Sequence, residues 1–273
     1  MQDFANIHKA RYQDTRRIAM EYIWLKEVDS TQKEIKRILK FTAKTSAESK
    51  TNTKSQIDSQ AQCKAQYKEF ESDTKNPKKI SQAKPKDICV IAQTQRAGIG
   101  SRGSLWENAK DSLMFSFTFS CPPKDLPKQS LAIYLGFVFK EVLSSLGSRV
   151  WLKYPNDLYV ENSKVGGVLV EIYDNHIICG IGLNFQSVKF GSLDIIPDKY
   201  EVLEKYFKIL QKPPTWKQIF RKYRLEFYRN FSFCFHFQGE QVSLKEAILR
   251  EDGALEVGGR IIYNLERYGV SNV

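Results

Sequence analysis

The stretch from residue 150 to residue 183 constrains the fold most, because four short apolar segments follow one another there through turn residues. The segments are residues 150–153, 159–160, 165–173 and 176–183. The pairs Pro155-Asn156, Glu161-Asn162 and Asp174-Asn175 lie between them and are typical of tight turns. Strands joined by such short turns pair in antiparallel fashion. The sequence therefore predicts a largely antiparallel meander.

Three helices are expected around this meander. Residues 130–146 are apolar on most of a helical surface, which predicts a helix buried between layers. A short helix is predicted after Asp29-Ser30-Thr31, whose side chains can cap a helix start. A third helix is predicted at 215–230, with one apolar face. That face consists of Trp216, Ile219, Phe220, Tyr223 and Phe227.

Further strands are expected on both sides of these elements. Residues 88–92 and 112–120 read as strands that flank a glycine-bearing loop. Near the end of the chain, short apolar segments alternate with glycine turns and predict a small barrel-like β domain. These segments are 241–244, 247–249, 254–257 and 261–265.

A polar segment at about 42–86 separates the first helix from these strands. Lys, Ser, Thr, Gln and Ala dominate it, and Ile57 and Ile80 are its only large aliphatic residues, so it reads as a solvated insertion. The 273 residues then divide into a catalytic-sized domain at 1–230, which contains the insertion, and a small β domain at 231–273.

Composition limits the class of protein. The net charge is +11, and residues 32–86 hold 14 Lys and Arg against 6 Asp and Glu. This segment could bind nucleic acid through phosphates, but only Phe41, Tyr67 and Phe70 could stack on bases, so a nucleic-acid partner is not favoured. Five dispersed cysteines without a C-x-x-C pair and a polar N-terminus favour the reducing cytoplasm, with no membrane anchor.

Two segments could bind phosphate. The first is the loop 95–103, in which Gly98, Gly100 and Gly103 allow close backbone approach and Arg96 and Arg102 add charge. It lacks the P-loop lysine, and a strand rather than a helix appears next, which excludes the dinucleotide fingerprint. A glycine-rich surface loop is the alternative.

The second segment surrounds the turn Pro155-Asn156-Asp157. Lys153 precedes it, and Lys164 lies at the edge of an apolar strand, where a cation needs an anionic partner such as phosphate. Two solvated lysines beside a hairpin are the alternative. A third segment, 179–185, places small residues in an apolar strand, which permits close approach by a ligand or equally by another part of the chain.

Taken in order, these segments resemble the catalytic domain of biotin protein ligases. The resemblance rests on residues 28–32, the loop 95–102 with Trp106, and the segments 153–158, 164–171 and 180–184. It implies an α+β fold, in which a mixed, mostly antiparallel sheet carries helices on one side and a small SH3-like β-barrel follows. About 23 residues precede the first motif, so no N-terminal DNA-binding repressor module is expected.

The resemblance also implies the roles of individual residues. Biotin is expected to bind at Ser30, Thr31, Gln32, Gln95, Gly98, Gly100, Ser101, Lys164 and Gly166. ATP and the adenylate are expected at Arg96, Arg102, Trp106, Lys153, Asn156 and Asn184, with Asn184 a possible Mg²⁺ contact. Lys164 and Arg102 are the expected catalytic residues.

The implied reaction has two steps. MgATP activates biotin to biotinyl-5′-AMP with release of pyrophosphate, and biotin then passes to a lysine of a biotin carboxyl carrier protein domain, as in acetyl-CoA carboxylase. A homodimer is possible. Family members usually read Gly-Arg-Gly-Arg-Arg-Gly in the loop, whereas Ile99 and Ser101 replace two arginines here, so weaker retention of the adenylate is expected. The alternative is a lipoate or octanoate ligase or transferase, which shares the fold.

Overall fold

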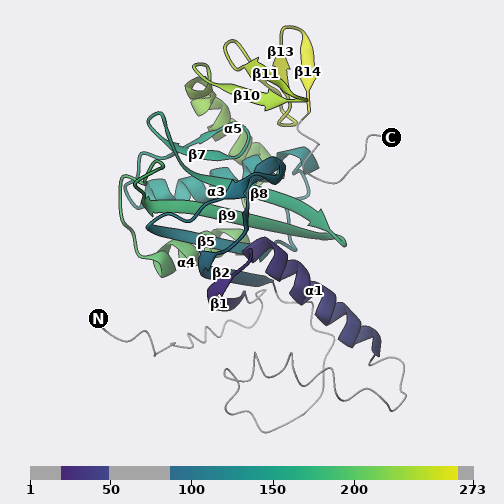
Figure 1. Ribbon diagram of the computed structural model, residues 1–273. Coiled ribbons are helices and arrows are strands. Elements are labelled where there is room, and N and C mark those ends of the chain that lie inside the picture. Colours follow the sequence, from purple (N-terminus) through teal and green to yellow (C-terminus); the bar gives the residue numbers. More distant parts are fainter. Residues whose placement is uncertain (1–19, 49–86, 264–273) are drawn as a thin grey trace.

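The computed structural model describes residues 20–48 and 87–263, and a seven-stranded sheet forms its centre (Figure 1). β1 and β2 pair in parallel, and every other pair of neighbours in this sheet is antiparallel. In spatial order the strands are β1 (Glu21–Val28), β2 (Ile88–Gln95), β5 (Asp111–Thr118), β9 (His176–Gln186), β8 (Ser163–Tyr173), β7 (Asp157–Val160) and β6 (Trp151–Lys153). The predicted meander is therefore confirmed.

Three helices cover one face of the sheet: α3 (Leu131–Ser145), α4 (Lys199–Gln211) and α5 (Trp216–Glu226). α3 packs against both other helices and against β6 and β8, and in Figure 1 it lies behind the sheet. Twelve of its residues are buried, as the apolar sequence predicted. α5 begins with a capping box between Thr215 and Gln218 and continues into a 3₁₀ turn, Phe227–Asn230.

The opposite face carries α1 (Thr31–Glu48). Ile35 of this helix is fully buried against Val90 and Ile178, whereas the adjacent Cys89 and Cys179 belong to the core under α3. Successive side chains in a strand point to opposite faces, so α1 and α3 lie on different sides of the sheet. The helix also extends beyond residue 42, where the solvated insertion was predicted to begin. Residues 49–86 of that insertion lie outside the described residues.

The C-terminal strands form two small sheets. β10 (Cys234–Phe237) pairs with β11 (Glu240–Ser243), and β12 (Ile248–Leu249), β13 (Leu255–Val257) and β14 (Arg260–Ile262) form the other. The small β domain is thus present, while a closed barrel and a boundary at residue 230 stay predictions.

A turn at 251–253 attaches these small sheets to the rest of the protein. Trp216 Nε1 donates to the Glu251 carbonyl at 2.7 Å, and Ser130 Oγ donates to the Asp252 carbonyl at 2.7 Å. Gly253 has a φ of +79°, and a β-carbon there would lie 2.0 Å from Ser130 Oγ. Only glycine therefore fits at this contact.

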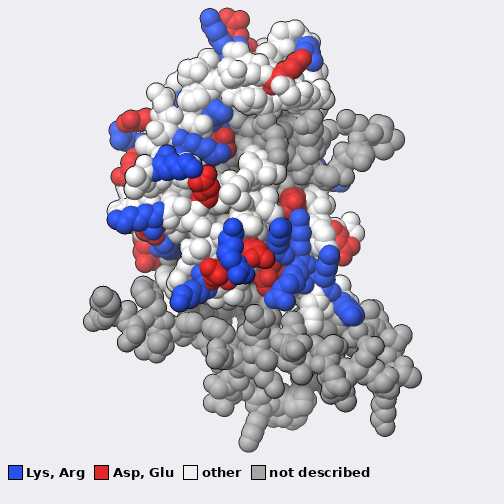
Figure 2. Space-filling model, viewed as in Figure 1, with Lys and Arg blue, Asp and Glu red and all other residues white. Residues whose placement is uncertain are grey.

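On the face shown in Figure 2, Lys and Arg side chains are interspersed with Asp and Glu side chains. Most of the basic residues of segment 32–86 lie outside the described residues, so the expectation that nucleic acid is not the partner stays a prediction. Within residues 20–48 and 87–263, we find no helix with the length and apolarity needed to cross a membrane.

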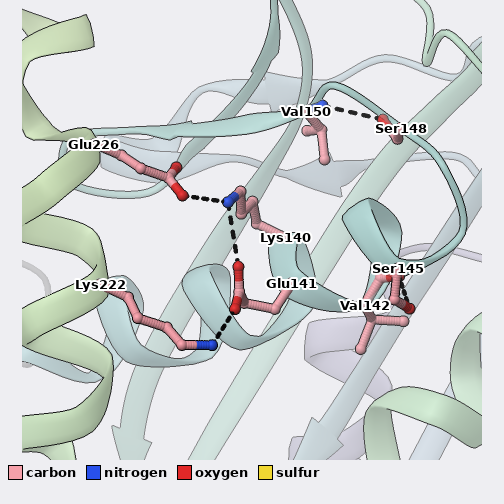
Figure 3. A network of polar contacts seen from close by, with 8 residues as sticks. All are labelled: Lys140, Glu141, Val142, Ser145, Ser148, Val150, Lys222 and Glu226. Carbon is pink, nitrogen blue, oxygen red and sulfur yellow. Dashed lines mark hydrogen bonds and ion pairs between the residues drawn. The ribbon is translucent and has the colours of Figure 1, made fainter.

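A network of charges joins α3 to α5 (Figure 3). The ammonium of Lys140, whose side chain is 9% exposed, lies 2.5 Å from Glu226 and 3.2 Å from Glu141. Glu141 also pairs with Lys222 at 2.6 Å. Burial alone would raise the pKa of Glu141, but hydrogen bonds and charge from Lys222 and Lys140 together hold it below its ordinary value. The network therefore stabilises the ionised form of this carboxyl.

Replacing Lys140 by methionine is expected to lower the free energy of unfolding by about 2 kcal/mol, because Glu226 then lies between α3 and α5 without the cation that it pairs with. The two carboxylates are partly exposed, so the loss is smaller than for a fully buried pair. Lys222→Met is the matched control, and its 62% exposed side chain predicts a loss under about 1 kcal/mol. Urea unfolding measures both, and equal losses would contradict the assignment.

Candidate active site

A cavity of about 430 Å³ lies between the start of α1, the loop 98–106 and strands β5, β8 and β9. The loop contains β3 (Gly98–Ile99), a 3₁₀ turn (Ser101–Gly103) and β4 (Leu105–Trp106). Most residues predicted from the sequence line this cavity. They are Ser30, Thr31, Gln32, Gln95, Gly100, Ser101, Trp106, Asn156, Lys164, Gly166 and Asn184.

Glycines in β8 and β9 form the floor of the cavity. A β-carbon at Gly182 would lie 2.4 Å from the Trp106 ring, and one at Gly180 would lie 2.7 Å from Gln32 Oε1. Real β-carbons do not approach other atoms this closely, so the glycines let Trp106 and Gln32 lie directly on the sheet. The small residues of segment 179–185 thus allow close packing. The side chains that pack on them, Gln32 and Trp106, line the cavity.

Hydrogen bonds fix Thr31 and Gln95 at one end. The backbone N–H of Thr31 donates to Gln95 Oε1 at 2.8 Å, and the Thr31 hydroxyl also donates to that oxygen at 3.2 Å. The same hydroxyl lies 2.8 Å from Ser116 Oγ. Both side chains are buried. This end of the cavity is therefore rigid and polar.

Four buried polar atoms of the cavity wall have no hydrogen-bond partner within the described part of the protein. They are Ser30 Oγ, Gln32 Oε1, Trp106 Nε1 and Asn184 Oδ1. Only two further side-chain atoms of the described residues share this property, and they belong to Tyr223 and Arg250. A buried polar group without a partner costs about 1–3 kcal/mol. Their concentration around one cavity indicates a ligand with both donors and acceptors.

Lys164 provides the cation of the cavity. Its ammonium lies 2.7 Å from Asp157 Oδ1, and its side chain is 44% exposed. Asp157 lines the cavity as well. Sequence reasoning placed Asp157 in a turn and gave it no role, because its contact with Lys164 depends on the pairing of β7 with β8. Asn156, in contrast, donates to the Val168 carbonyl at 2.6 Å and ties the turn to β8.

Three predicted residues lie outside the cavity wall. Arg96 pairs with Asp29 at 3.0 Å and with Glu27 at 3.5 Å. The ammonium of Lys153 lies over the rings of Tyr159 and Phe233. Gly98 lies behind the wall, where a β-carbon would meet the Trp106 carbonyl at 2.6 Å. Nucleotide roles for Arg96 and Lys153 gain no support from these positions.

The loop residues Arg102, Ile99 and Ser101 were central to the prediction. The backbone of Arg102 lies in the 3₁₀ turn, and its side chain is outside the described part of the protein. Ile99 and Ser101, which replace two arginines usual in the family, line the cavity. Weaker retention of the adenylate stays a prediction.

The cavity lining includes residues that the sequence did not single out. Glu107 and Phe190 line the cavity, and Lys189, which precedes Phe190, pairs with Glu107 at 2.7 Å. Gly191 packs so closely on the backbone of Lys164 that a β-carbon would lie 2.6 Å from its carbonyl oxygen. An irregular loop with one glycine carries no pattern from which these contacts could be derived.

No cluster of three His, Cys, Asp or Glu side chains suited to a metal occurs among residues 20–48 and 87–263. Asn184 Oδ1 is nevertheless a free acceptor in the cavity wall. One amide oxygen fits a Mg²⁺ ion that takes its other ligands from phosphates and water.

Comparison with known proteins agrees with this geometry. Residues 67–184 match the biotin/lipoate A/B protein ligase family. A Helicobacter pylori structure, described as biotin acetyl coenzyme A carboxylase synthetase with bound biotinylated ATP, is 37% identical. The alignment covers 90% of this chain and 100% of that one, with a TM-score of 0.71. The chain belongs to the biotin/lipoate A/B protein ligase family.

Two further proteins are similar to this chain, one over most of its fold and one over part of its sequence. The biotin protein ligase of Aquifex aeolicus, solved with biotin and ATP, is 22% identical over 90% of this chain and 96% of its own, with a TM-score of 0.59, and shows the same fold. The bifunctional ligase/repressor BirA of Escherichia coli is 34% identical over 113 residues, or 39% of this chain. That match spans only 35% of the length of the curated relative.

Proposed function

We propose that this chain is a biotin protein ligase, which activates biotin with ATP and transfers it to a lysine of a carrier protein. The observation that carries the proposal is the set of unpaired polar atoms around the cavity. Biotin is an apolar bicycle with a ureido group that both donates and accepts hydrogen bonds. Such a ligand offers partners to these atoms while its hydrocarbon part lies against Phe115, Val168 and Ile181.

Lys164 is the residue that we propose acts in the first chemical step. An oxygen of the biotin carboxylate forms a bond to the α-phosphorus of ATP, and the bond to the β-phosphate oxygen breaks with its electron pair, which releases pyrophosphate. Negative charge accumulates on the α-phosphate oxygens. An ammonium held at the wall by Asp157 offsets that charge without having to reorganise. When bound, Mg²⁺ neutralises the phosphate charges.

The second step requires a shielded mixed anhydride. The uncharged amine of the acceptor lysine attacks the acyl carbon, the acyl–oxygen bond breaks, and AMP leaves while the nitrogen loses a proton to water. The loop 98–106 and Phe190 enclose the cavity and limit hydrolysis before the acceptor arrives.

Some parts of this proposal come from relatives. The carrier domain of acetyl-CoA carboxylase is the proposed acceptor, because a Mycobacterium tuberculosis relative, 26% identical over 125 residues, is named biotin–[acetyl-CoA-carboxylase] ligase. Cytoplasmic location and a homodimer stay predictions.

The proposal is tested by ATP–pyrophosphate exchange with biotin, lipoate and octanoate supplied separately. Exchange is expected with biotin alone, followed by a mass increase of a carrier domain incubated with the enzyme, biotin and ATP. Exchange with lipoate or octanoate instead would assign the chain to the other branch of the family. Exchange with none of the three acids would refute the ligase function.

A further inference from the structure

The side-chain amide of Gln32 has one satisfied end and one unsatisfied end. Gln32 Nε2 donates to Glu171 Oε2 at 2.8 Å, whereas Oε1 is buried at the cavity wall without a partner in the described residues. The side chain is pressed against Gly180, so it has little space to move. The cavity therefore presents an acceptor at this point.

We propose that Glu171, held by Lys36, is a positioning residue that turns the Gln32 carbonyl toward the cavity and so selects an acid that carries an N–H donor. This inference rests on the proposed function. It concerns residues outside the predicted biotin site, since Glu171 lies in β8 and Lys36 lies one turn along α1 from Gln32.

The orientation follows from hydrogen-bonding chemistry. A carboxylate has acceptors only, so the amide nitrogen of Gln32 must face Glu171, and the amide oxygen then lies on the side of Gly180, which lines the cavity. Lys36 Nζ lies 2.9 Å from the same carboxylate oxygen, and it also lies 5.6 Å from the centre of the Tyr173 ring. Glu171 and Tyr173 are two residues apart in β8 and point to the same face. Two contacts therefore fix the position of Lys36: the ion pair with Glu171 and the cation–π contact with Tyr173.

An acceptor in the wall distinguishes the candidate acids. Biotin has two donors, both ureido N–H groups, because its carboxylate and thioether only accept. Ionised lipoate and octanoate have no donor at all. Either acid would leave Gln32 Oε1 buried and unpaired, and a site that loses such a partner discriminates strongly against the ligand without the donor.

Exchanging the two side chains tests the proposal. In Glu171→Gln, the new amide can donate to Gln32 Oε1 once the Gln32 amide group flips by 180°, which exchanges its oxygen and nitrogen within the same volume and removes the fixed acceptor. The dissociation constant of biotin, measured by calorimetry, is expected to rise about tenfold, while kcat in pyrophosphate exchange stays within about twofold. In the double variant Gln32→Glu/Glu171→Gln, the new amide donates to a carboxylate whose other oxygen faces the cavity, so the constant should return to within about threefold of wild type.

Two lysines of α1 supply a matched control. Lys36→Met is expected to weaken biotin binding about threefold. Lys40→Met should leave it unchanged, since Lys40 lies over the same Tyr173 ring at 5.9 Å but has no ion pair with Glu171 among the described contacts. Unfolding midpoints of all variants show whether the fold is retained.

The outcomes separate this inference from the proposed function. Unchanged biotin binding in Glu171→Gln, or a double variant no better than the single variant, would overturn the positioning role even if the wild type is an active ligase. A wild type that neither binds biotin nor supports exchange would overturn both.

Discussion

Replacing Lys164 by alanine is expected to lower the rate of biotin-dependent ATP–pyrophosphate exchange about 10²- to 10³-fold. The side chain of Lys164 lines the cavity. In the proposed reaction, negative charge develops on the α-phosphate oxygens bound in this cavity. Removing one preorganised stabilising group from such a site costs about 3–4 kcal/mol. The loss should appear mainly in kcat, because the interaction strengthens as the phosphorus is attacked.

A lysine of equal exposure provides the control for this prediction. Lys205 lies on α4 with a 44% exposed side chain, the same value as Lys164, and pairs with Glu201 outside the cavity. Lys205→Ala should keep full exchange activity. Asp157→Asn should lower the rate less than Lys164→Ala does, because the cation remains but is held less firmly. If Lys164→Ala and Lys205→Ala had the same activity, Lys164 could not stabilise the transition state.

The order of segments was sufficient to predict the meander and the buried helix, but the longer elements β1 and α4 were not predicted, and neither were the short strands β3, β4 and β10. β1 is an edge strand whose residues are exposed or half-buried, so its sequence lacks a clear alternation. α4 does carry a helical pattern. Asp198 caps it by accepting from the Glu201 N–H, and the apolar residues at 202, 203, 206, 207 and 210 are buried. The capping residue and the apolar spacing are therefore sufficient to predict this helix from the sequence.

In the candidate site, the positions of several side chains could not be predicted from the local sequence. Lys153 and Lys164 flank the same turn and looked equivalent, yet Lys164 faces the cavity and Lys153 packs on Tyr159 and Phe233. Lys153 lies in β6, which pairs with β7, whereas Lys164 lies in β8, whose register with β7 shifts between Leu158 and Tyr159, so the difference depends on how three strands pair. Glu171 is the last residue of the segment 164–171, which is part of the family resemblance. Its contact with Gln32 could not be predicted, because it requires α1 to pack across the sheet.

The second large effect on activity is expected from adding a methyl group to a glycine that packs on Trp106. Gly182→Ala should lower kcat/KM for biotin about 10- to 100-fold. The new methyl group would lie 2.4 Å from the Trp106 ring, so the ring must move and the wall shared with Gln32 and Lys164 is displaced. Overpacking of this kind costs about 1–3 kcal/mol. Steady-state exchange kinetics at varied biotin concentrations measure the effect.

Gly167→Ala is the matched control, because Gly167 pairs with Gly182 on the neighbouring strand and faces the same ring. A β-carbon at Gly167 would lie 3.6 Å from the nearest atoms of Trp106 and Asp157, which is ordinary contact. Its kcat/KM should therefore stay within about threefold of wild type. Both variants add one methyl group to the same cavity, so added volume alone predicts equal losses. A loss confined to Gly182→Ala would instead show that activity depends on the position of the Trp106 ring, and equal activities of the two variants would refute that dependence.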